Sequence, residues 1–151
     1  MIVGQLCQRK TVTVSPKDEL VAAARLMRER HVGYLVVVEE DPATEVLRPI
    51  GVLTDRDIVI AVIAKEAELK ALRAGDVMNP QPVVIEESQS IEAALQQMRR
   101  AGVRRLPVIG RRGELSGVLS LDDVLDYLAG QVQNVAGAIR NERQIEGTVR
   151  S

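Results

Sequence analysis

Aromatic side chains are almost absent from this sequence: Tyr34 and Tyr127 are its only two. The core must therefore be aliphatic, and the chain lacks the rings on which proteins stack single-stranded nucleic acid. Cysteine and histidine occur once each, as Cys7 and His31, which excludes an intrachain disulfide and a cysteine metal cluster. With no evident nucleophile–base pair or metal cluster, we predict that the chain is not an enzyme and needs no cofactor. Cys7 is expected to be a small buried residue, and His31 to cap the end of a helix.

Long apolar runs are also missing. The longest, residues 58–64, is far shorter than the ~20 residues that span a bilayer. Residues 1–6 have neither the basic start nor the apolar stretch of a signal peptide, so we expect a cytoplasmic protein without membrane contact. The sequence is 46% hydrophobic and 27% charged with a net charge of −1, values typical of a globular chain. This near-neutral charge argues against general nucleic-acid binding.

The chain contains an internal repeat, which decides how the fold is read. A shift of 71 positions aligns nine identical pairs, beginning with Gly4 and Gly75. Beyond residues 39–50, where prolines predict a loop that tolerates insertion, a shift of 66 aligns four more, including Asp57 with Asp123. Because all these identities keep the same order, we infer a duplicated unit.

Hydrophobic spacing predicts strand, helix, strand, strand, helix in each repeat. A unit of this size cannot bury both faces of its sheet alone. We therefore predict an α+β fold in which two β-α-β-β-α repeats, related by a pseudo-twofold axis, form one module with clefts between them. The expected boundaries are 1–66 for the first repeat, 67–74 for a linker, 75–130 for the second repeat and 131–151 for a helical tail.

A hydroxyl residue three positions before an aspartate follows the last strand of each repeat. The pairs are Thr54 with Asp57 and Ser120 with Asp123. Such a pair is a common helix-start device, in which the hydroxyl and the acid satisfy free backbone N–H groups. The same turn can bind a nucleotide, because its N–H groups attract anions and its carboxylate can accept hydrogen bonds from ribose hydroxyls. The two uses are compatible.

The duplicated G-h-h-[ST]-x-x-D pattern after a valine-rich strand resembles a tandem cystathionine β-synthase (CBS) domain pair, or Bateman module. Residues 51–59 and 102–108 are similar to small stand-alone bacterial members, and the resemblance covers residues 3–129. It implies a regulatory sensor that binds AMP, ADP or ATP, with NAD and S-adenosylmethionine as further options, and that signals by a change of conformation or of dimer surface.

The resemblance also implies roles for individual residues. Asp57 and Asp123 would each hold a ribose, and Thr54 and Ser120 would lie near the ribose or the phosphates. The adenine slot would be formed by backbone near the first two strands of each repeat, at Thr11, Val12, Tyr34, Leu35, Pro82, Val83, Leu106 and Pro107.

The two halves differ at charged positions. Arg104 and Arg105, which the resemblance assigns to phosphate binding, align with uncharged residues of the first repeat, whereas Arg56 aligns with Asp122. We therefore expect unequal clefts. The cleft at the first motif, with Arg56 beside it, should favour phosphates, and the cleft at the second should take a less charged ligand or remain empty.

Two other interpretations stay open. The six arginines between Arg99 and Arg112 have no acid among them, so they form either a solvated surface, a set of phosphate contacts, or a surface for a polyanion such as nucleic acid. The chain could also be a constitutive dimeric adaptor whose clefts bind nothing.

The tail has an apolar helical face at Val132, Val135 and Ile139, which can pack on its own module or on a second copy. The resemblance implies a homodimer. Since we recognise no output domain in the sequence, the signal is expected to pass to a separate effector protein.

Overall fold

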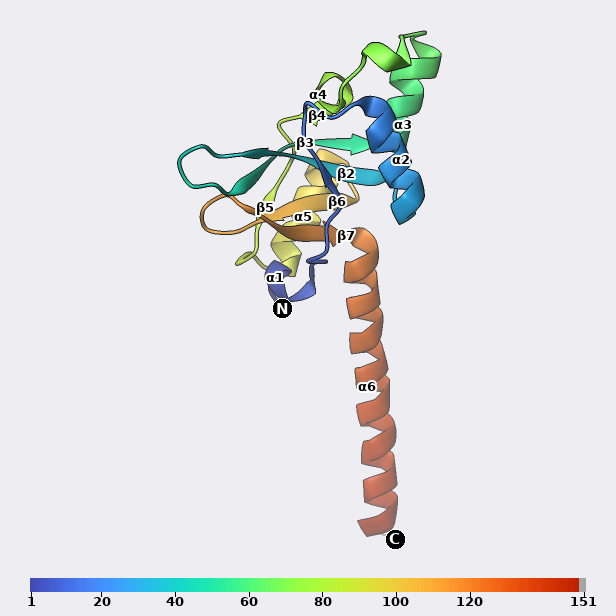
Figure 1. The fold of residues 1–151 in the computed structure, drawn as a ribbon. Helices are drawn as coiled ribbons and strands as arrows, with labels where there is room; N and C mark the ends of the chain where they lie inside the picture. Colours follow the sequence, from blue (N-terminus) through green and yellow to red (C-terminus); the bar gives the residue numbers. More distant parts are fainter. Residues whose placement is uncertain (150–151) are drawn as a thin grey trace.

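Two separate sheets form the β-structure, and each is built mainly by one repeat (Figure 1). The computed structural model describes residues 1–149, so residues 150–151, the end of the predicted tail, lie outside the described part. The first repeat contains α1 (Val3–Leu6), β1 (Thr13–Val14), α2 (Leu20–Arg30), β2 (Tyr34–Glu40), β3 (Leu47–Thr54), α3 (Asp55–Val59), the π-helical turn η1 (Ile60–Ala64) and the 3₁₀ turn η2 (Leu69–Ala71). The second contains α4 (Ala74–Val77), β4 (Asn79–Pro80), β5 (Ile85–Glu86), α5 (Ile91–Ala101), β6 (Arg105–Ile109), β7 (Leu115–Ser120) and the start of α6 (Leu121–Val149).

The first three strands of the two sheets share one topology. In the order β1-β2-β3-β4, β1 runs parallel to β2 and the other neighbours are antiparallel. In the order β5-β6-β7, β5 runs parallel to β6 and β7 is antiparallel to β6. A parallel pair needs a crossover connection, which α2 and α5 provide. The predicted α+β fold of two similar repeats is confirmed.

The crossover helices α2 and α5 are matched in sequence and burial. Both end at a residue in the left-handed conformation, His31 with φ 54° and Gly102 with φ 67°, whose backbone N–H closes the last turn. The prediction that His31 caps a helix is thus confirmed. Each helix buries one narrow stripe at spacings of three and four, namely Leu20, Ala23 and Met27 in α2, and Ile91, Ala94 and Met98 in α5.

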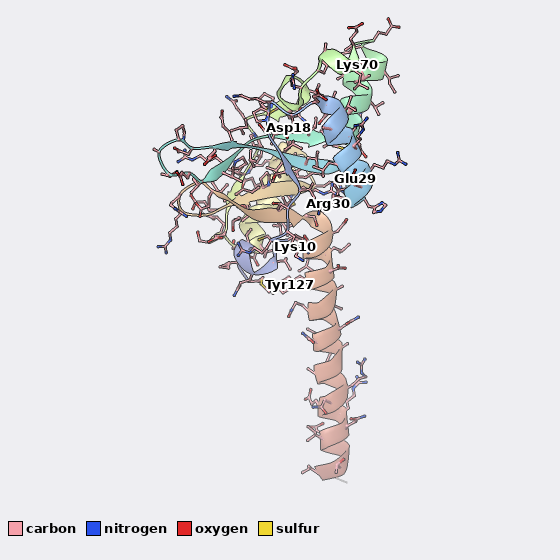
Figure 2. All side chains as sticks on the ribbon, in the orientation of Figure 1. Lys10, Asp18, Glu29, Arg30, Lys70 and Tyr127 are labelled. Carbon is pink, nitrogen blue, oxygen red and sulfur yellow. The ribbon has the colours of Figure 1, made fainter. Side chains whose placement is uncertain are left out.

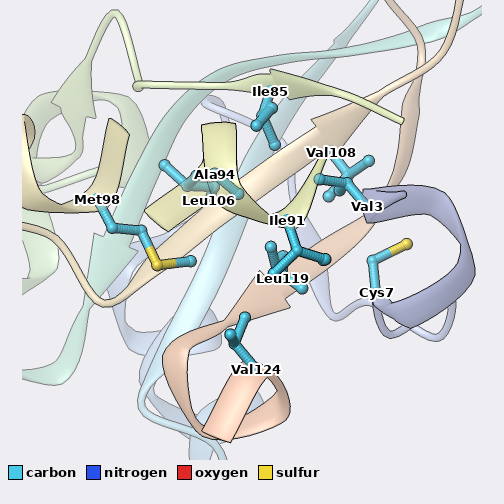
Figure 3. Close-up of a cluster of buried hydrophobic side chains, with 10 residues drawn as sticks. All are labelled: Val3, Cys7, Ile85, Ile91, Ala94, Met98, Leu106, Val108, Leu119 and Val124. Carbon is cyan, nitrogen blue, oxygen red and sulfur yellow. The ribbon is translucent and has the colours of Figure 1, made fainter. Parts of the chain in front are cut away.

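Each repeat lends its first segment to the core of the other repeat. Val3 and Cys7 are buried with residues of α5, β6 and β7 in the second core (Figure 3). In the mirror arrangement, Ala74 of α4 is buried in the first core among residues of α2, β2 and β3. The N–H of Gly4 donates to the carbonyl of Glu87 at 2.9 Å, and that of Gly75 donates to Pro16, also at 2.9 Å. The repeats are therefore interlocked rather than joined end to end.

Three local expectations differ from the structure. The loop expected at residues 39–50 is mostly a β-hairpin, because β2 and β3 stay paired as far as Glu40 and Leu47. The last helix predicted for the first repeat is interrupted: α3 passes into η1, and the chain then turns at Glu66, whose φ is 53°. Finally, the last helix and the tail are one continuous helix, α6. Among residues 1–149, no helix has the length and apolarity needed to cross a membrane.

Candidate functional site

The two hydroxyl-x-x-Asp turns have the reciprocal geometry of a helix cap. Thr54 Oγ1 accepts from the N–H of Asp57 at 3.2 Å, and Asp57 Oδ2 accepts from the N–H of Thr54 at 2.9 Å. Ser120 and Asp123 make the same two bonds at 3.1 and 3.2 Å. The capping interpretation is therefore correct for both turns. Capping takes up only part of each carboxylate, so it leaves a ligand role open.

A side-chain amide from the opposite repeat holds each aspartate. Asn79 Nδ2 donates to Asp57 Oδ2, and Gln8 Nε2 donates to Asp123 Oδ1, both at 3.2 Å. Oδ2 of Asp57 thus makes both of these local bonds, which leaves its Oδ1 for another donor. At Asp123 each oxygen accepts one of the two bonds, Oδ2 from the N–H of Ser120 and Oδ1 from Gln8. The aspartates differ in the acceptor capacity that they offer to a ligand.

The first cleft, which we name the Asp57 cleft, has a volume of about 440 Å³. This falls within the size range of small-molecule sites. Its hydroxyl and one cation, Thr54 and Arg56, come from the first repeat, and Arg104 and Arg105 come from the second. Asp57 itself does not line this cleft, but it is hydrogen-bonded to two residues that do, Thr54 and Asn79. The rest of the wall is mostly apolar: Tyr34, Val52, Pro82, Val83, Gly102, Val103 and Pro107.

The second cleft, the Asp123 cleft, has a volume of about 310 Å³ and includes Ser120 and Asp123 directly in its wall. The segment before β1 and the end of α2 add Lys10 and His31, two basic residues that the alignment of charges between the repeats did not consider. The cleft is therefore not poor in basic residues, contrary to the premise from which a less charged ligand was predicted. The other lining residues are Gln8, Thr11, Val12, Val32, Gly33, Tyr34, Val36, Arg105 and Val118.

Tyr34 and Arg105 line both clefts. The guanidinium carbon of Arg105 lies 5.5 Å from the centre of the Tyr34 ring, a cation–π geometry. Burial raises the pKa of the Tyr34 hydroxyl well above its usual range, and the positive charge of Arg105 opposes part of that rise. The phenol therefore stays protonated at neutral pH and can act as a hydrogen-bond donor at the boundary between the clefts.

Arg104 makes a weak ion pair within its own repeat. Its side chain pairs with Asp122 at 3.5 Å, and the two side chains are 71% and 73% exposed. Exposed pairs of this kind contribute little to stability. Arg104 can therefore exchange Asp122 for an anion in the Asp57 cleft. The other four arginines of the predicted cluster are also exposed, Arg99 and Arg100 at the end of α5 and Arg111 and Arg112 in the turn after β6.

Two residues expected in the adenine slot line neither cleft. Leu35 and Leu106 have no exposed surface and belong to the first and second cores, respectively. They point away from the clefts because alternate residues of a strand face opposite sides of the sheet, whereas Tyr34 and Arg105 precede them and face the clefts. Thr11 and Val12 line the Asp123 cleft, and Pro82, Val83 and Pro107 line the Asp57 cleft.

Sequence reasoning missed the two amides that hold the aspartates. The signal was available, because the shift of 71 positions aligns Gln8 with Asn79. Amide side chains at equivalent positions of two repeats are expected to make equivalent hydrogen bonds. Lys10 and His31 offered no such sign, because nothing local to them indicates which cleft they reach.

A further polar cluster lies away from both clefts. Glu87 accepts hydrogen bonds from the Ser116 hydroxyl at 2.6 Å and from Arg9 at 3.2 Å, and Arg9 also donates to Ser116. The bond from Ser116, followed by that from Arg9, lowers the pKa of the Glu87 carboxyl. Arg9 donates in addition to the carbonyl of Gly4 at 2.7 Å, so the cluster ties the first segment of the chain to the second repeat. Within residues 1–149, no three or more His, Cys, Asp or Glu side chains gather in a metal-binding group.

Known proteins are similar to this chain in sequence and in fold. The chain is 32% identical over 134 residues to the protein MK0525 of Methanopyrus kandleri, a match that covers 87% of this chain and 66% of that protein. It is 33% identical over 115 residues to hypoxic response protein 1 of Mycobacterium tuberculosis, covering 76% of each. Among solved structures, the CBS domain protein PAE2072 from Pyrobaculum aerophilum, complexed with AMP, has a TM-score of 0.70 at 26% identity and covers 82% of this chain and 89% of that one.

The family model of the CBS domain matches this chain twice, at residues 3–64 and 74–130. These matches coincide with the two interlocked repeats whose hydroxyl-x-x-Asp turns border the clefts. The chain therefore belongs to the CBS domain family, as a tandem pair of CBS domains.

Proposed function

We propose that this chain is a regulatory module that binds an adenosine nucleotide in the Asp57 cleft. The observation that carries the proposal is the composition of this cleft, which combines three arginines with an apolar wall from two repeats and has Asp57 hydrogen-bonded to Thr54 and Asn79 of its wall. The relative from Pyrobaculum aerophilum, which was solved with AMP, supports this choice of ligand.

Each group has a role that its chemistry allows. Oδ1 of Asp57, which its local bonds do not use, accepts hydrogen bonds from the ribose hydroxyls. Arg56, Arg104 and Arg105 bind the phosphates, since guanidinium groups match phosphate oxygens in geometry and charge. Adenine lies against the apolar wall near Pro82 and Val83.

The regulatory step follows from the position of the cleft between the repeats. A ligand that touches both repeats favours the arrangement in which Arg56 and the pair Arg104 and Arg105 reach it together, and so shifts the population of conformations. The proposal includes a homodimer and a separate effector protein that reads this shift. It assigns regulation rather than catalysis to the module.

Calorimetric titration with AMP, ATP, NAD and S-adenosylmethionine tests the proposal. Asp57→Asn should lower the affinity for the ligand that binds most tightly by about tenfold or more, because a charge-assisted hydrogen bond contributes roughly 1.5–3 kcal/mol. Asp123→Asn should have a smaller effect. Asp126→Asn, a change on the exposed surface of α6, is the matched control, and thermal unfolding of each variant checks that it is folded. Equal affinities for the Asp57 and Asp126 variants would refute the site.

The two alternatives give different results in the same series. An adaptor with empty clefts shows no ligand-dependent rise in Tm, whereas a ligand at 100 times its Kd should add roughly 2.7 kcal/mol to the free energy of unfolding. Polyanion binding through the arginine cluster would depend steeply on salt and would survive Asp57→Asn.

A further inference from the structure

Helix α6 continues far beyond the second repeat. It leaves the module as a straight rod, and in Figures 1 and 2 no other element lies beside it past Tyr127. From residue 131 to residue 149, every residue except Ala136 and Gly137 is exposed. At 1.5 Å per residue, this part of the helix is about 28 Å long.

An apolar seam runs along this rod. Its residues follow one another at alternating spacings of three and four, which is the 3.5-residue period of a coiled coil rather than the broad face of a helix that packs on a sheet. The seam, which we name the α6 seam, consists of Leu125 (64% exposed), Leu128 (45%), Val132 (68%), Val135 (62%) and Ile139 (46%).

The α6 seam is not covered by its own module, because its five residues are 45–68% exposed and no other element lies beside the rod that α6 forms past Tyr127 (Figure 1). Nor does the intrinsic preference of the sequence account for the helix. Gly130 and Gly137 lie in its interior, where glycine is unfavourable. Helices in proteins gain most of their stability from packing of an apolar face, so this segment requires a partner.

We propose that the partner is the α6 seam of a second copy, packed antiparallel. From Leu128 to Ile139 the seam is self-complementary about a point between Val132 and Val135, whereas Leu125 falls opposite Glu142. In this register Val132 of one copy meets Val135 of the other, and Leu128 meets Ile139, which gives four successive apolar layers. Ala129 and Ala136 flank the seam and leave it unobstructed.

The charges select the antiparallel direction. The next two seam positions are Glu142 and Glu146, and a parallel pair would set each of them against its own counterpart. The antiparallel register instead brings Arg143 of one copy close to the exposed Asp122 of the other. It also places the starts of the two α6 helices roughly 38 Å apart along their axis. No residue of the seam lines a cleft, and the register touches the Asp57 cleft only indirectly, through the ion pair of Asp122 with Arg104. Cross-linking therefore tests the pairing separately from the nucleotide titrations.

Disulfide cross-linking tests both the pairing and its direction. Leu128→Cys and Ile139→Cys variants of the full chain, mixed and mildly oxidised, should form the mixed disulfide. Leu128→Cys alone should give little covalent dimer, because its two copies would lie roughly 16 Å apart along the axis. The wild-type chain, whose single Cys7 is buried, is the control. Failure of the mixed disulfide, or efficient cross-linking of Leu128→Cys alone, would overturn the proposal.

Sedimentation and circular dichroism provide a second measurement. The double variant Val132→Asp with Val135→Asp should lose helical signal and mixed-disulfide formation, while Gln133→Asp with Asn134→Asp, off the seam on the same turn, should retain both. Equal behaviour of the two double variants overturns the proposal. So does a monomeric wild-type chain whose helical signal rises only when anionic lipid vesicles are added, since the seam would then bind lipid.

Discussion

Arg105 of the second repeat stacks over the ring of Tyr34 of the first repeat, and the shift of 71 positions makes these two residues equivalent. The pair stands between the two clefts and contributes to the wall of both. A cation–π contact at a partly exposed site contributes about 0.5–1 kcal/mol, whereas a hydrogen bond to a charged group contributes roughly 1.5–3 kcal/mol. The Arg105 guanidinium should therefore leave the Tyr34 ring and bind a phosphate when one is present in either cleft.

Replacing Arg105 should separate phosphate recognition from the recognition of the nucleoside. Arg105→Met keeps an unbranched stem over Tyr34 but removes the charge. We expect the affinity for AMP to fall by about tenfold or more and the affinity for adenosine to change little, as measured by calorimetry. Arg100→Met, at the exposed end of α5, is the control. Equal losses for AMP and adenosine would show that Arg105 acts through packing instead.

The amides that cross between the repeats should position the aspartates. Asn79→Ala removes the bond to Asp57 Oδ2. A single hydrogen bond contributes about 1 kcal/mol, so we expect Tm to fall by roughly 2–4 °C and nucleotide affinity to fall with it. Gln8→Ala should lower Tm similarly through Asp123. Gln96→Ala, on the exposed side of α5, is the comparison; an Asn79→Ala protein with unchanged Tm and affinity would contradict the positioning role.

Gly117 should tolerate no side chain. A Cβ atom there would lie 2.6 Å from the carbonyl oxygen of Gln8 and 2.9 Å from Cys7 Sγ, so the crossing segment would have to move. We expect Gly117→Ala to lower the free energy of unfolding by about 1–3 kcal/mol in urea titrations. Gly130→Ala, where nothing lies within 4 Å of the added atom, should instead stabilise α6 by up to about 1 kcal/mol. If Gly117→Ala raised the free energy of unfolding and Gly130→Ala lowered it, the close contact of Gly117 with Cys7 and Gln8 would be refuted.

The Cys7 thiol should react slowly in the folded chain. Burial raises its pKa and outweighs the nearby positive charge of Arg9, so the thiol is neutral at pH 8. Its contribution to stability is complete below the pKa of the unfolded thiol and is lost as the pH rises toward and through the folded pKa. Alkylation at pH 8 should be much faster in urea than in buffer. Equal rates would contradict the burial of Cys7.

Several features were predictable from sequence because they depend on short-range interactions. The turn that joins Thr54 to Asp57 closes within one helical turn, and its partner at Ser120 is an independent copy of it. By contrast, Leu35 was assigned to a slot although it is a core residue. The faces of a strand alternate with each residue, and without the fold nothing in its apolar sequence says which face meets the core.

The sequence alone determined the duplication, the elements of each repeat and the capped turns, since each depends on identities in one chain or on bonds between close neighbours. Only the tertiary structure decided that Gln8 serves the second repeat and Asn79 the first, and that Lys10 and His31 reach the Asp123 cleft. These contacts arise because the repeats exchange their first segments. The exchange is set by the burial of side chains such as Val3 and Ala74 in cores formed by distant parts of the chain.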